Sequence, residues 1–271
     1  VKAFSQGRVF LAGDAAHITP PFVGQGLVAG LRDAANLCWK LASVIHGHAS
    51  PQILATYDQE RRPHVKAMIR FAQLMGRLVM PRNAAVALVT HGLMRAMRLV
   101  PKWRAYFEEL EIKPRNICRR GLFVAGSTRS GLTRGALVPQ GWVRGANGRT
   151  CLSDDVLGPG LTLIGFGRDA GAALDVRTAA AFAAAGGTVI QIAHRGQRLH
   201  LAANGGWEDL EGAFLPRAAP FGWAAVVRPD RVVIHDGPVG EASRLIAESK
   251  ALLGTPIGAM PPITEPAQSF V

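Results

Sequence analysis

Apolar residues recur at helical spacing over much of the first hundred positions of the chain. From Leu27 to about His46 they return every three or four residues, which predicts a long, mostly buried helix. Just before it, the run Arg8–Ala12 is short, apolar and rich in residues that favour strands. This run predicts a buried strand that ends in a turn at Gly13 and Asp14. The apolar positions of the helix are Leu27, Leu31, Ala34, Cys38, Leu41, Ala42 and Ile45.

Prolines divide the helical region that follows. Ser50 and Pro51 predict a helix start, because serine caps the free N–H groups and proline suits the first turn. Pro63 predicts a kink or a restart, since proline lacks the amide hydrogen that a helix interior uses. Helical spacing then continues over two segments, 64–80 and 83–100, and each of them is ended by a proline.

The second half of the chain changes to alternating strands and helices. Residues 114–157 are rich in Gly, Arg and Pro without a sustained period, so we expect a connector there. The order strand–helix–strand and then strand–strand–helix predicts a small α/β unit of the thioredoxin type at 158–271. With a mostly helical unit at 1–113, the whole chain is α/β, or α+β overall. The expected elements are strands at 161–166, 188–192, 222–228 and 231–235 and helices at 170–185 and 241–253.

The composition is that of a globular protein. Of 271 residues, 48% are hydrophobic and 18% charged, which excludes a mainly disordered or collagen-like chain. We expect no membrane span, which needs ~20 mostly apolar residues, and we see no signal peptide. Cys38, Cys118 and Cys151 are odd in number and far apart, so neither a disulfide framework nor a thiolate metal site is expected. A reducing, cytoplasmic location fits this cysteine usage.

The net charge of +12 is concentrated in the first half of the chain. Residues 1–134 hold 20 Lys and Arg against 7 Asp and Glu, while residues 135–271 hold 11 against 12. A basic half attracts anions, which include nucleic acid, anionic lipid, and an anionic cofactor or substrate. The cations are scattered and accompany no recognisable nucleic-acid-binding module. Nucleic-acid binding is therefore the less favoured interpretation, and no nucleic-acid partner is expected.

The segment from Arg8 to Leu41 carries the candidate chemistry. A strand that ends at Asp14 would place a carboxylate where it can accept hydrogen bonds from the hydroxyl groups of a sugar alcohol. Gly24 and Gly26 allow a ligand to approach the backbone, and the following helix directs free N–H groups and its positive dipole end toward the same place. The glycine spacing differs from the dinucleotide-binding fingerprint. On these residues alone, a locally capped turn is an equal alternative.

The same segment resembles the second flavin-binding motif of the class A flavoprotein aromatic hydroxylases, the group that includes para-hydroxybenzoate and phenol hydroxylases. Within this group it is most similar to the 3-(3-hydroxyphenyl)propionate hydroxylase-like branch. The resemblance is strong over residues 8–70 and continues collinearly to the end of the chain, where phenol-hydroxylase-like members carry a thioredoxin-like domain. The matching residues are Arg8–His17, Pro20-Pro21, Gly24-Gln25-Gly26, Asp33–Leu37, Trp39–Leu41 and Tyr57–Pro63.

The resemblance implies a site for FAD. Asp14 would accept hydrogen bonds from the ribityl chain, and the backbone at the start of the helix would face N1 and O2 of the isoalloxazine ring. Family members often carry Asn or another small polar residue at the position of Val28, so this side chain would add no polar contact to the flavin. The cofactor-binding residues implied in this way are Gly13, Asp14, Pro21, Gly24, Gly26, Leu27 and Val28.

The resemblance also implies a reaction. An FAD-dependent monooxygenase of this family uses NAD(P)H and O2 to hydroxylate a phenolic substrate, and Pro20, Pro21 and Phe22 would border the substrate side of the flavin. The thioredoxin-like unit lacks a C-x-x-C pair, which favours packing or homodimer formation over redox exchange. Catalytic residues are not assigned. No metal is expected at His46 or His48, which are typical of a solvated helix end.

The chain is expected to be the C-terminal portion of such a hydroxylase. It begins at Val1, and the glycine-rich first motif that holds the ADP half of FAD is not found in it. The alternatives left open are a non-catalytic flavoprotein fragment and a dimerisation module. His17, within the motif, is expected to make a structural hydrogen bond in the turn rather than to act as a general base.

Overall fold

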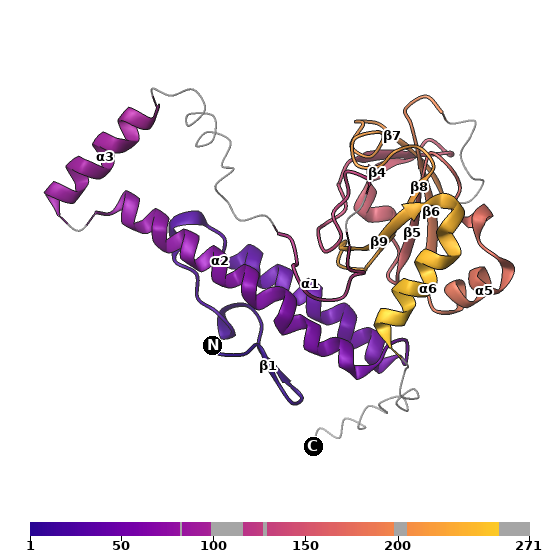
Figure 1. The fold of residues 1–271 in the computed structure, drawn as a ribbon, viewed down its shortest axis with the longest axis horizontal. Helices are drawn as coiled ribbons and strands as arrows, with labels where there is room; N and C mark the ends of the chain where they lie inside the picture. Colours follow the sequence, from indigo (N-terminus) through magenta and orange to yellow (C-terminus); the bar gives the residue numbers. More distant parts are fainter. Residues whose placement is uncertain (82, 99–115, 127–128, 198–204, 255–271) are drawn as a thin grey trace, which may run out of the picture.

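The structure, a computed structural model, describes residues 1–81, 83–98, 116–126, 129–197 and 205–254 (Figure 1). Two long helices and a small hairpin form the N-terminal part, and a sheet with two helices against it forms the C-terminal part. The two parts are in contact at the end of the last helix. There the carbonyl group of Leu253 accepts a hydrogen bond from the N–H group of Ser50 at 2.8 Å.

The first apolar run contains a short strand, as predicted, which pairs with the preceding residues in an antiparallel hairpin. Its expected burial is wrong. Val9 is 64% exposed, whereas Phe10 is half-buried and packs in the cluster of Tyr57. A two-stranded ribbon has too few neighbours to bury both of its faces, which leaves Val9 in solvent. The elements of this region are β1 (Ser5–Gln6), β2 (Val9–Phe10) and 3-10 turns at Gly13–Ala15 and Pro21–Val23.

The predicted long helix is confirmed as α1 (Gly26–Ile45), but a different face of it is buried. Leu27 and Leu31, on the apolar face that was expected to be covered, are 77% and 61% exposed. The buried face instead carries polar side chains, which find partners on neighbouring elements. Because those partners come from distant parts of the chain, spacing along the helix could not reveal this face. The buried residues of α1 are Ala29, Asp33, Asn36, Leu37, Trp39 and Lys40.

The second long helix, α2 (Ala55–Val79), runs through Pro63 without a break, so the expected restart is wrong. An interior proline costs a helix about 3 kcal/mol, and the buried face of α2 offsets this cost through packing. The predicted start is confirmed, since the Oγ of Ser50 accepts from the N–H of Gln52 at 3.3 Å before the 3-10 turn Pro51–Leu54. The predicted break at Pro81 separates α2 from α3 (Ala84–Arg98), and the one at Pro101 lies outside the described residues.

The C-terminal part is built on a seven-stranded mixed sheet with the order β4-β3-β7-β6-β5-β8-β9. As predicted, β5 and β6 are parallel and connected through α5, and the hairpin β8–β9 leads into α6. The range 114–157, expected to be a connector, contributes β3 and β4, and β7 has no counterpart among the predicted strands. The elements are β3 (Trp142–Gly145), β4 (Thr150–Leu152), β5 (Thr162–Phe166), β6 (Thr188–Ala193), β7 (Gly206–Asp209), β8 (Trp223–Val227), β9 (Val233–Pro238), α5 (Val176–Ala184) and α6 (Ala242–Leu253).

The two faces of the sheet are buried under different layers. Successive side chains of a strand point to opposite faces, so Leu163 and Ile164 of β5 belong to separate core clusters. The cluster of Leu163 includes Phe182 of α5 and Leu245 of α6, and Figure 1 shows these helices on one side of the sheet. The cluster of Ile164 is completed by loop residues such as Phe214. The sheet is therefore an α/β unit covered by helices on one side and by loops on the other.

Candidate functional site

The turn that follows β2 lies directly against α1. Gly13 adopts a φ of +57°, and its N–H group donates to Oδ2 of Asp33 at 3.1 Å. A Cβ atom on Gly30 would lie 3.2 Å from the Cα of Gly13, so glycine is what lets the turn and the helix approach this closely. The side chain of Asp14 is exposed at this turn. Since Gly30 lies about one helical turn after the first residue of α1, Asp14 is held near the start of the helix.

Asp33 ties the turn to both long helices. Its buried carboxylate lies 2.7 Å from Nε2 of His17, and its Oδ1 accepts a hydrogen bond from Nε of Arg61 at 2.8 Å. His17 thus makes a structural contact, although the partner lies on α1 and not within the turn. The sequence interpretation assigned no role to Asp33 beyond its place in the motif. The signal that could have found it is its helical spacing with Asn36 and Lys40, which puts three polar residues on one face.

The first amide groups of α1 are available to a ligand. The N–H groups of Gly26, Leu27 and Val28 have no acceptor among the described residues, and Ala29 is the first with a bonded amide. No side chain caps this end, and no acidic residue lies in the first turn. A Cβ atom on Gly24 or Gly26 would meet nothing within 4 Å, so the space beside them is open. This end of α1 can stabilise negative charge.

Pro20 and Phe22 line a cavity of about 750 Å³ between the loop and the end of α2, which we call the loop cavity. The ring of Phe22 rests on Gly76, where a Cβ atom would come within 2.5 Å of its Cε2. Pro21, the third predicted substrate-side residue, is exposed and does not line the cavity. The lining residues are Pro20, Phe22, Gln73, Gly76, Arg77, Met80, Pro81, Asn83 and Val86.

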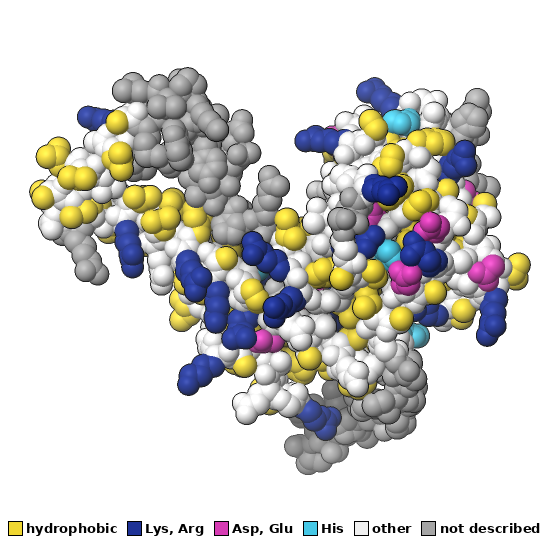
Figure 2. Space-filling view, in the orientation of Figure 1, with side chains coloured by type: hydrophobic (Ala, Val, Ile, Leu, Met, Phe, Trp, Pro, Cys, Tyr) yellow, Lys and Arg dark blue, Asp and Glu magenta, His cyan; other side chains and the backbone are white. Residues whose placement is uncertain are grey.

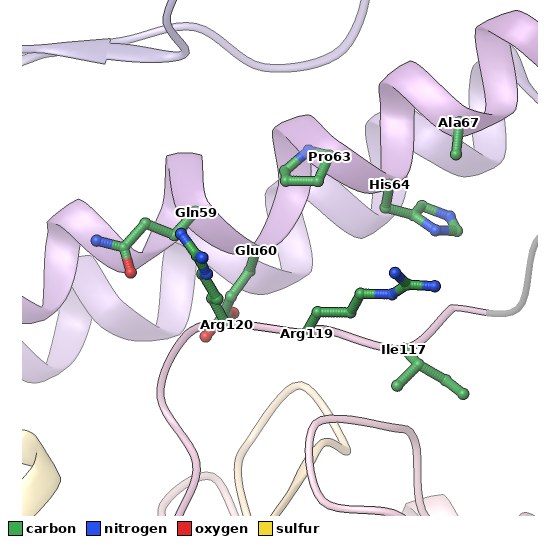
Figure 3. A pocket seen from close by; sticks show the side chains of 8 residues that line it. All are labelled: Gln59, Glu60, Pro63, His64, Ala67, Ile117, Arg119 and Arg120. Carbon is green, nitrogen blue, oxygen red and sulfur yellow. The ribbon is translucent and has the colours of Figure 1, made fainter. Parts of the chain in front are cut away.

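Another cavity, of about 740 Å³, lies between the first half of α2 and residues 117–120 (Figure 3). In this view the side chain of Arg119 lies below His64, and Arg120 lies near Gln59. Both arginines are exposed and have no acceptor in the part of the chain that the structure describes. No residue of the loop around Pro20 lines this cavity, so it is separate from the predicted flavin site.

A buried ionic network joins the two parts of the protein. Glu60 of α2 accepts hydrogen bonds from Arg228, which follows β8, at 2.8 and 2.9 Å, and from Lys40 at 3.0 Å. Arg228 also pairs with Asp230, whose Oδ2 accepts from the side-chain amide of Asn36 at 3.1 Å. The backbone carries no side chain at Gly121, where a Cβ atom would collide with Glu60. The sequence alone assigned none of these groups to a site.

Charge within this network determines the ionisation of its members. Burial raises the pKa of Glu60, but the charges of Arg228 and Lys40 outweigh burial and hold that pKa well below its usual range. Burial, together with the Arg228 charge, lowers the pKa of Lys40 to about 8 despite the opposing effect of Glu60. Glu60 is therefore ionised at neutral pH and serves as the acceptor at the junction of the two parts.

The described ranges hold neither a metal-binding cluster nor a membrane-spanning helix. No group of three or more His, Cys, Asp and Glu side chains is placed to hold a metal ion there. No helix in the same ranges has the length and apolar character required to cross a membrane. His46 and His48 are both exposed, and their ring centroids lie 6.2 Å apart. The three cysteines are unpaired.

Two family models match the chain. Residues 1–72 match an FAD binding domain, and residues 135–252 match the HcaD C-terminal domain. The first match covers the turn, α1 and most of α2, and the second covers the sheet and almost all of α6. One matched range therefore lies in the N-terminal part of the structure, and the other lies in the C-terminal part.

Curated relatives are longer than this chain. The 3-(3-hydroxy-phenyl)propionate/3-hydroxycinnamic acid hydroxylase 2 of Burkholderia vietnamiensis is 40% identical over 244 residues, which are 86% of this chain and 44% of the relative. The 3-(3-hydroxy-phenyl)propionate/3-hydroxycinnamic acid hydroxylase of Mycobacterium avium is 43% identical over 157 residues, which are 58% of this chain and 27% of the relative. The chain therefore spans less than half the length of these relatives.

Solved structures with the same fold are also longer. The flavin-dependent monooxygenase PieE, in complex with FAD and substrate, matches with a TM-score of 0.66 and 25% identity over 94% of this chain and 49% of that one. The rebeccamycin biosynthetic enzyme RebC, with reduced flavin, matches with a TM-score of 0.61 and 26% identity over 91% and 46%. Sequence and structural comparison together confirm the predicted resemblance.

Proposed function

We propose that this chain, a relative of the FAD-dependent aromatic hydroxylases, provides the flavin-binding turn and the substrate-side loop of a monooxygenase that hydroxylates a phenolic compound with NAD(P)H and O2. The observation that carries this proposal is the close contact of Gly13 with Gly30. Together with the hydrogen bond from Gly13 to Asp33, this contact fixes an exposed carboxylate, Asp14, near the free amides of α1. A carboxylate and a helix start held together suit a ligand that has both hydroxyl groups and an anionic ring.

The residues of the turn and the helix start fit the ribityl chain and ring of FAD. Asp14 would accept hydrogen bonds from the ribityl hydroxyls, and the N–H groups of Gly26, Leu27 and Val28 would donate to the pyrimidine side of the ring. Gly24 supports the fit, because the space beside it is open. FAD, when bound, supplies the redox chemistry that couples oxidation of NAD(P)H to insertion of one oxygen atom.

The start of α1 would favour negative charge on the bound ring. Its amides carry the positive end of the helix dipole, and the first turn holds no acidic residue that would oppose an anion. Val28 contributes only its backbone to this contact, since its side chain cannot donate a hydrogen bond. We expect this end of the helix to orient the ring and to hold its negative charge.

The substrate class that we propose is a phenol that carries a carboxylate. The relatives from Burkholderia vietnamiensis and Mycobacterium avium are named for a hydroxyphenyl propionate and a hydroxycinnamic acid, both of which have this chemistry. Pro20 and Phe22 supply apolar surface in the loop cavity on which an aromatic ring can rest. These two residues would therefore border the substrate, whereas Pro21 would contact the flavin side.

The thioredoxin-like unit is proposed to be structural. Its Arg228 enters the buried network with Glu60, which supports a role in holding α1 and α2 in place. Formation of a homodimer through residues 158–271 and a cytoplasmic location are further parts of the proposal. Size-exclusion chromatography with light scattering tests the homodimer, which would have twice the mass of the 28.8 kDa chain.

The proposal is tested by titrating the purified chain with FAD and following flavin fluorescence and absorbance. We expect saturable binding that is weakened about 10-fold or more in Asp14→Asn, because a charged acceptor is lost. Asp155→Asn, an exposed carboxylate on the sheet unit, is the matched control and should bind FAD as the unchanged chain does. Absence of flavin binding at saturating FAD, or equal affinity in both variants, would refute the proposed site.

A further inference from the structure

The loop cavity has one apolar side and one polar side. The apolar side comes from Pro20 and Phe22 of the loop and from Met80 and Val86 at the end of α2 and in α3. Hydrophobic side chains also gather over the outer end of α2 and over α3 in Figure 2, on the upper left. A ring can therefore be covered by apolar groups at this end of the cavity.

The polar side comes from one face of α2. Gln73 and Arg77 are four residues apart in α2, so their side chains lie along the same face of the helix. Arg77 is the only charged residue that lines the cavity, and it has no acceptor among the described residues. Asn83 is already engaged, because its Oδ1 accepts from the N–H of Val86 at 2.8 Å.

No carboxylate of the surrounding helices competes for Arg77. The sequence contains no Asp or Glu between Glu60 and Glu108, a range that includes the rest of α2 and all of α3. A guanidinium group presents several N–H donors in a fixed plane and matches both oxygen atoms of a carboxylate. An acid that enters the cavity would thus meet one unpaired cation.

The position of the ring-binding side is fixed by close packing. The ring of Phe22 lies against Gly76, the residue before Arg77, at a distance that leaves no room for a Cβ atom. The loop is therefore seated on the same turn of α2 that carries the cation. A ligand with its ring on Pro20 and Phe22 would place a short acidic tail toward Arg77.

We infer that Arg77 determines specificity by binding the carboxylate of a phenolic acid whose ring rests on Pro20 and Phe22. This inference rests on the proposed function, because it assigns the loop cavity to the substrate of the same site. Arg77 is a specificity-determining residue in this scheme. It holds the tail of the substrate and takes no part in oxygen transfer.

The test compares an acid with its neutral analogue. Binding of 3-(3-hydroxyphenyl)propionate and of the corresponding amide to the full chain is measured by NMR titration. We expect the acid to bind about 10-fold more weakly to Arg77→Gln, while the amide binds equally to both proteins. Arg77→Lys should retain part of the affinity for the acid, since the charge remains but the paired donors are lost.

Arg70→Gln is the matched control, because Arg70 is exposed on the same helix and does not line the cavity. It should bind the acid as the unchanged chain does. Three results would overturn the inference. They are equal binding of acid and amide to the unchanged chain, an affinity for the acid that is unchanged in Arg77→Gln, and no binding of either compound to the unchanged chain. Titration with FAD separates the two proposals, since Arg77→Gln should bind FAD normally. An affinity for the acid that is unchanged in Arg77→Gln, with normal FAD binding, refutes only the role of Arg77. Failure of the unchanged chain to bind FAD refutes the proposed function.

Discussion

Glu60 and Arg228 form a buried ion pair although 168 positions separate them in the sequence. Nη1 of the arginine lies 2.8 Å from Oε1 of the glutamate, and Nη2 lies 2.9 Å from Oε2. The pair connects α2 with the hairpin β8–β9 of the sheet. On α2, the next residue after Glu60 is Arg61, which holds Asp33. The two parts of the protein thus meet one residue away from the contacts that position the turn.

Breaking this pair should destabilise the protein strongly. Glu60→Gln leaves Arg228 and Lys40 buried with less compensating charge, so we expect the free energy of unfolding to fall by about 3–5 kcal/mol. Urea denaturation measured by circular dichroism gives this value. Arg244→Gln is the control, because its partners Glu241 and Glu248 are exposed and the change in unfolding free energy should be small. A loss in Glu60→Gln no larger than that of the control would contradict the prediction.

Lowering the pH should destabilise the unchanged chain more than it destabilises the Glu60→Gln variant. Burial raises the pKa of Glu60, but Arg228 and Lys40 lower it further, so the folded pKa lies well below the ordinary 4.5. The folded state therefore binds fewer protons between these two values, and the stability from ionised Glu60 is present above about pH 4.5 and lost as pH falls below it. We expect an extra loss of about 1.4 kcal/mol per pH unit in this range. If the stability of the two proteins falls in parallel between pH 5 and pH 3, Glu60 is not the group that causes the loss of stability in acid.

Asp33→Asn should weaken FAD binding even though Asp33 is not expected to touch the cofactor. The substitution removes the charge that Arg61 and His17 face in the buried cluster, and it loosens the acceptor of the Gly13 amide. We expect a loss of about 3 kcal/mol in the free energy of unfolding and a several-fold rise in the dissociation constant of FAD. Flavin titration at a temperature where the variant remains folded measures the second effect. Unchanged FAD affinity in a destabilised variant would limit Asp33 to a structural role.

Gly76→Ala should displace the loop from α2. The added Cβ atom would come within 2.5 Å of the Phe22 ring, which is closer than packed carbon atoms allow. We expect a loss of about 1–3 kcal/mol in stability and weaker binding of a phenolic acid, because the ring-binding side of the loop cavity moves. Gly92→Ala on α3 is the control, since its Cβ atom would meet nothing within 4 Å. If Phe22→Ala in the same protein does not restore stability to Gly76→Ala, the collision is not the cause.

The segment from Gly13 to the start of α1 is the part of the candidate site whose local elements follow most directly from the sequence. Gly13, Asp14 and the glycines before α1 are adjacent residues, so their order along the chain carries most of the local geometry. The helix at Leu27, the cap at Ser50 and the closing βα elements are confirmed for the same reason. The roles of Asp14 and the helix start in binding FAD stay predictions that the titration can decide.

Local patterns by themselves determined the type and position of most elements and the resemblance to flavin hydroxylases. Tertiary structure alone decided which side of each element is buried. The apolar side of α1 lies in solvent while Asp33 and Lys40 are buried, because their partners are Arg61 and Glu60 on another helix. Pro63 stays within α2, and β3 joins the sheet through β7, more than 60 residues away. Hydrogen bonds and ion pairs between distant residues can outweigh local preference, and their partners become visible only when the chain is folded.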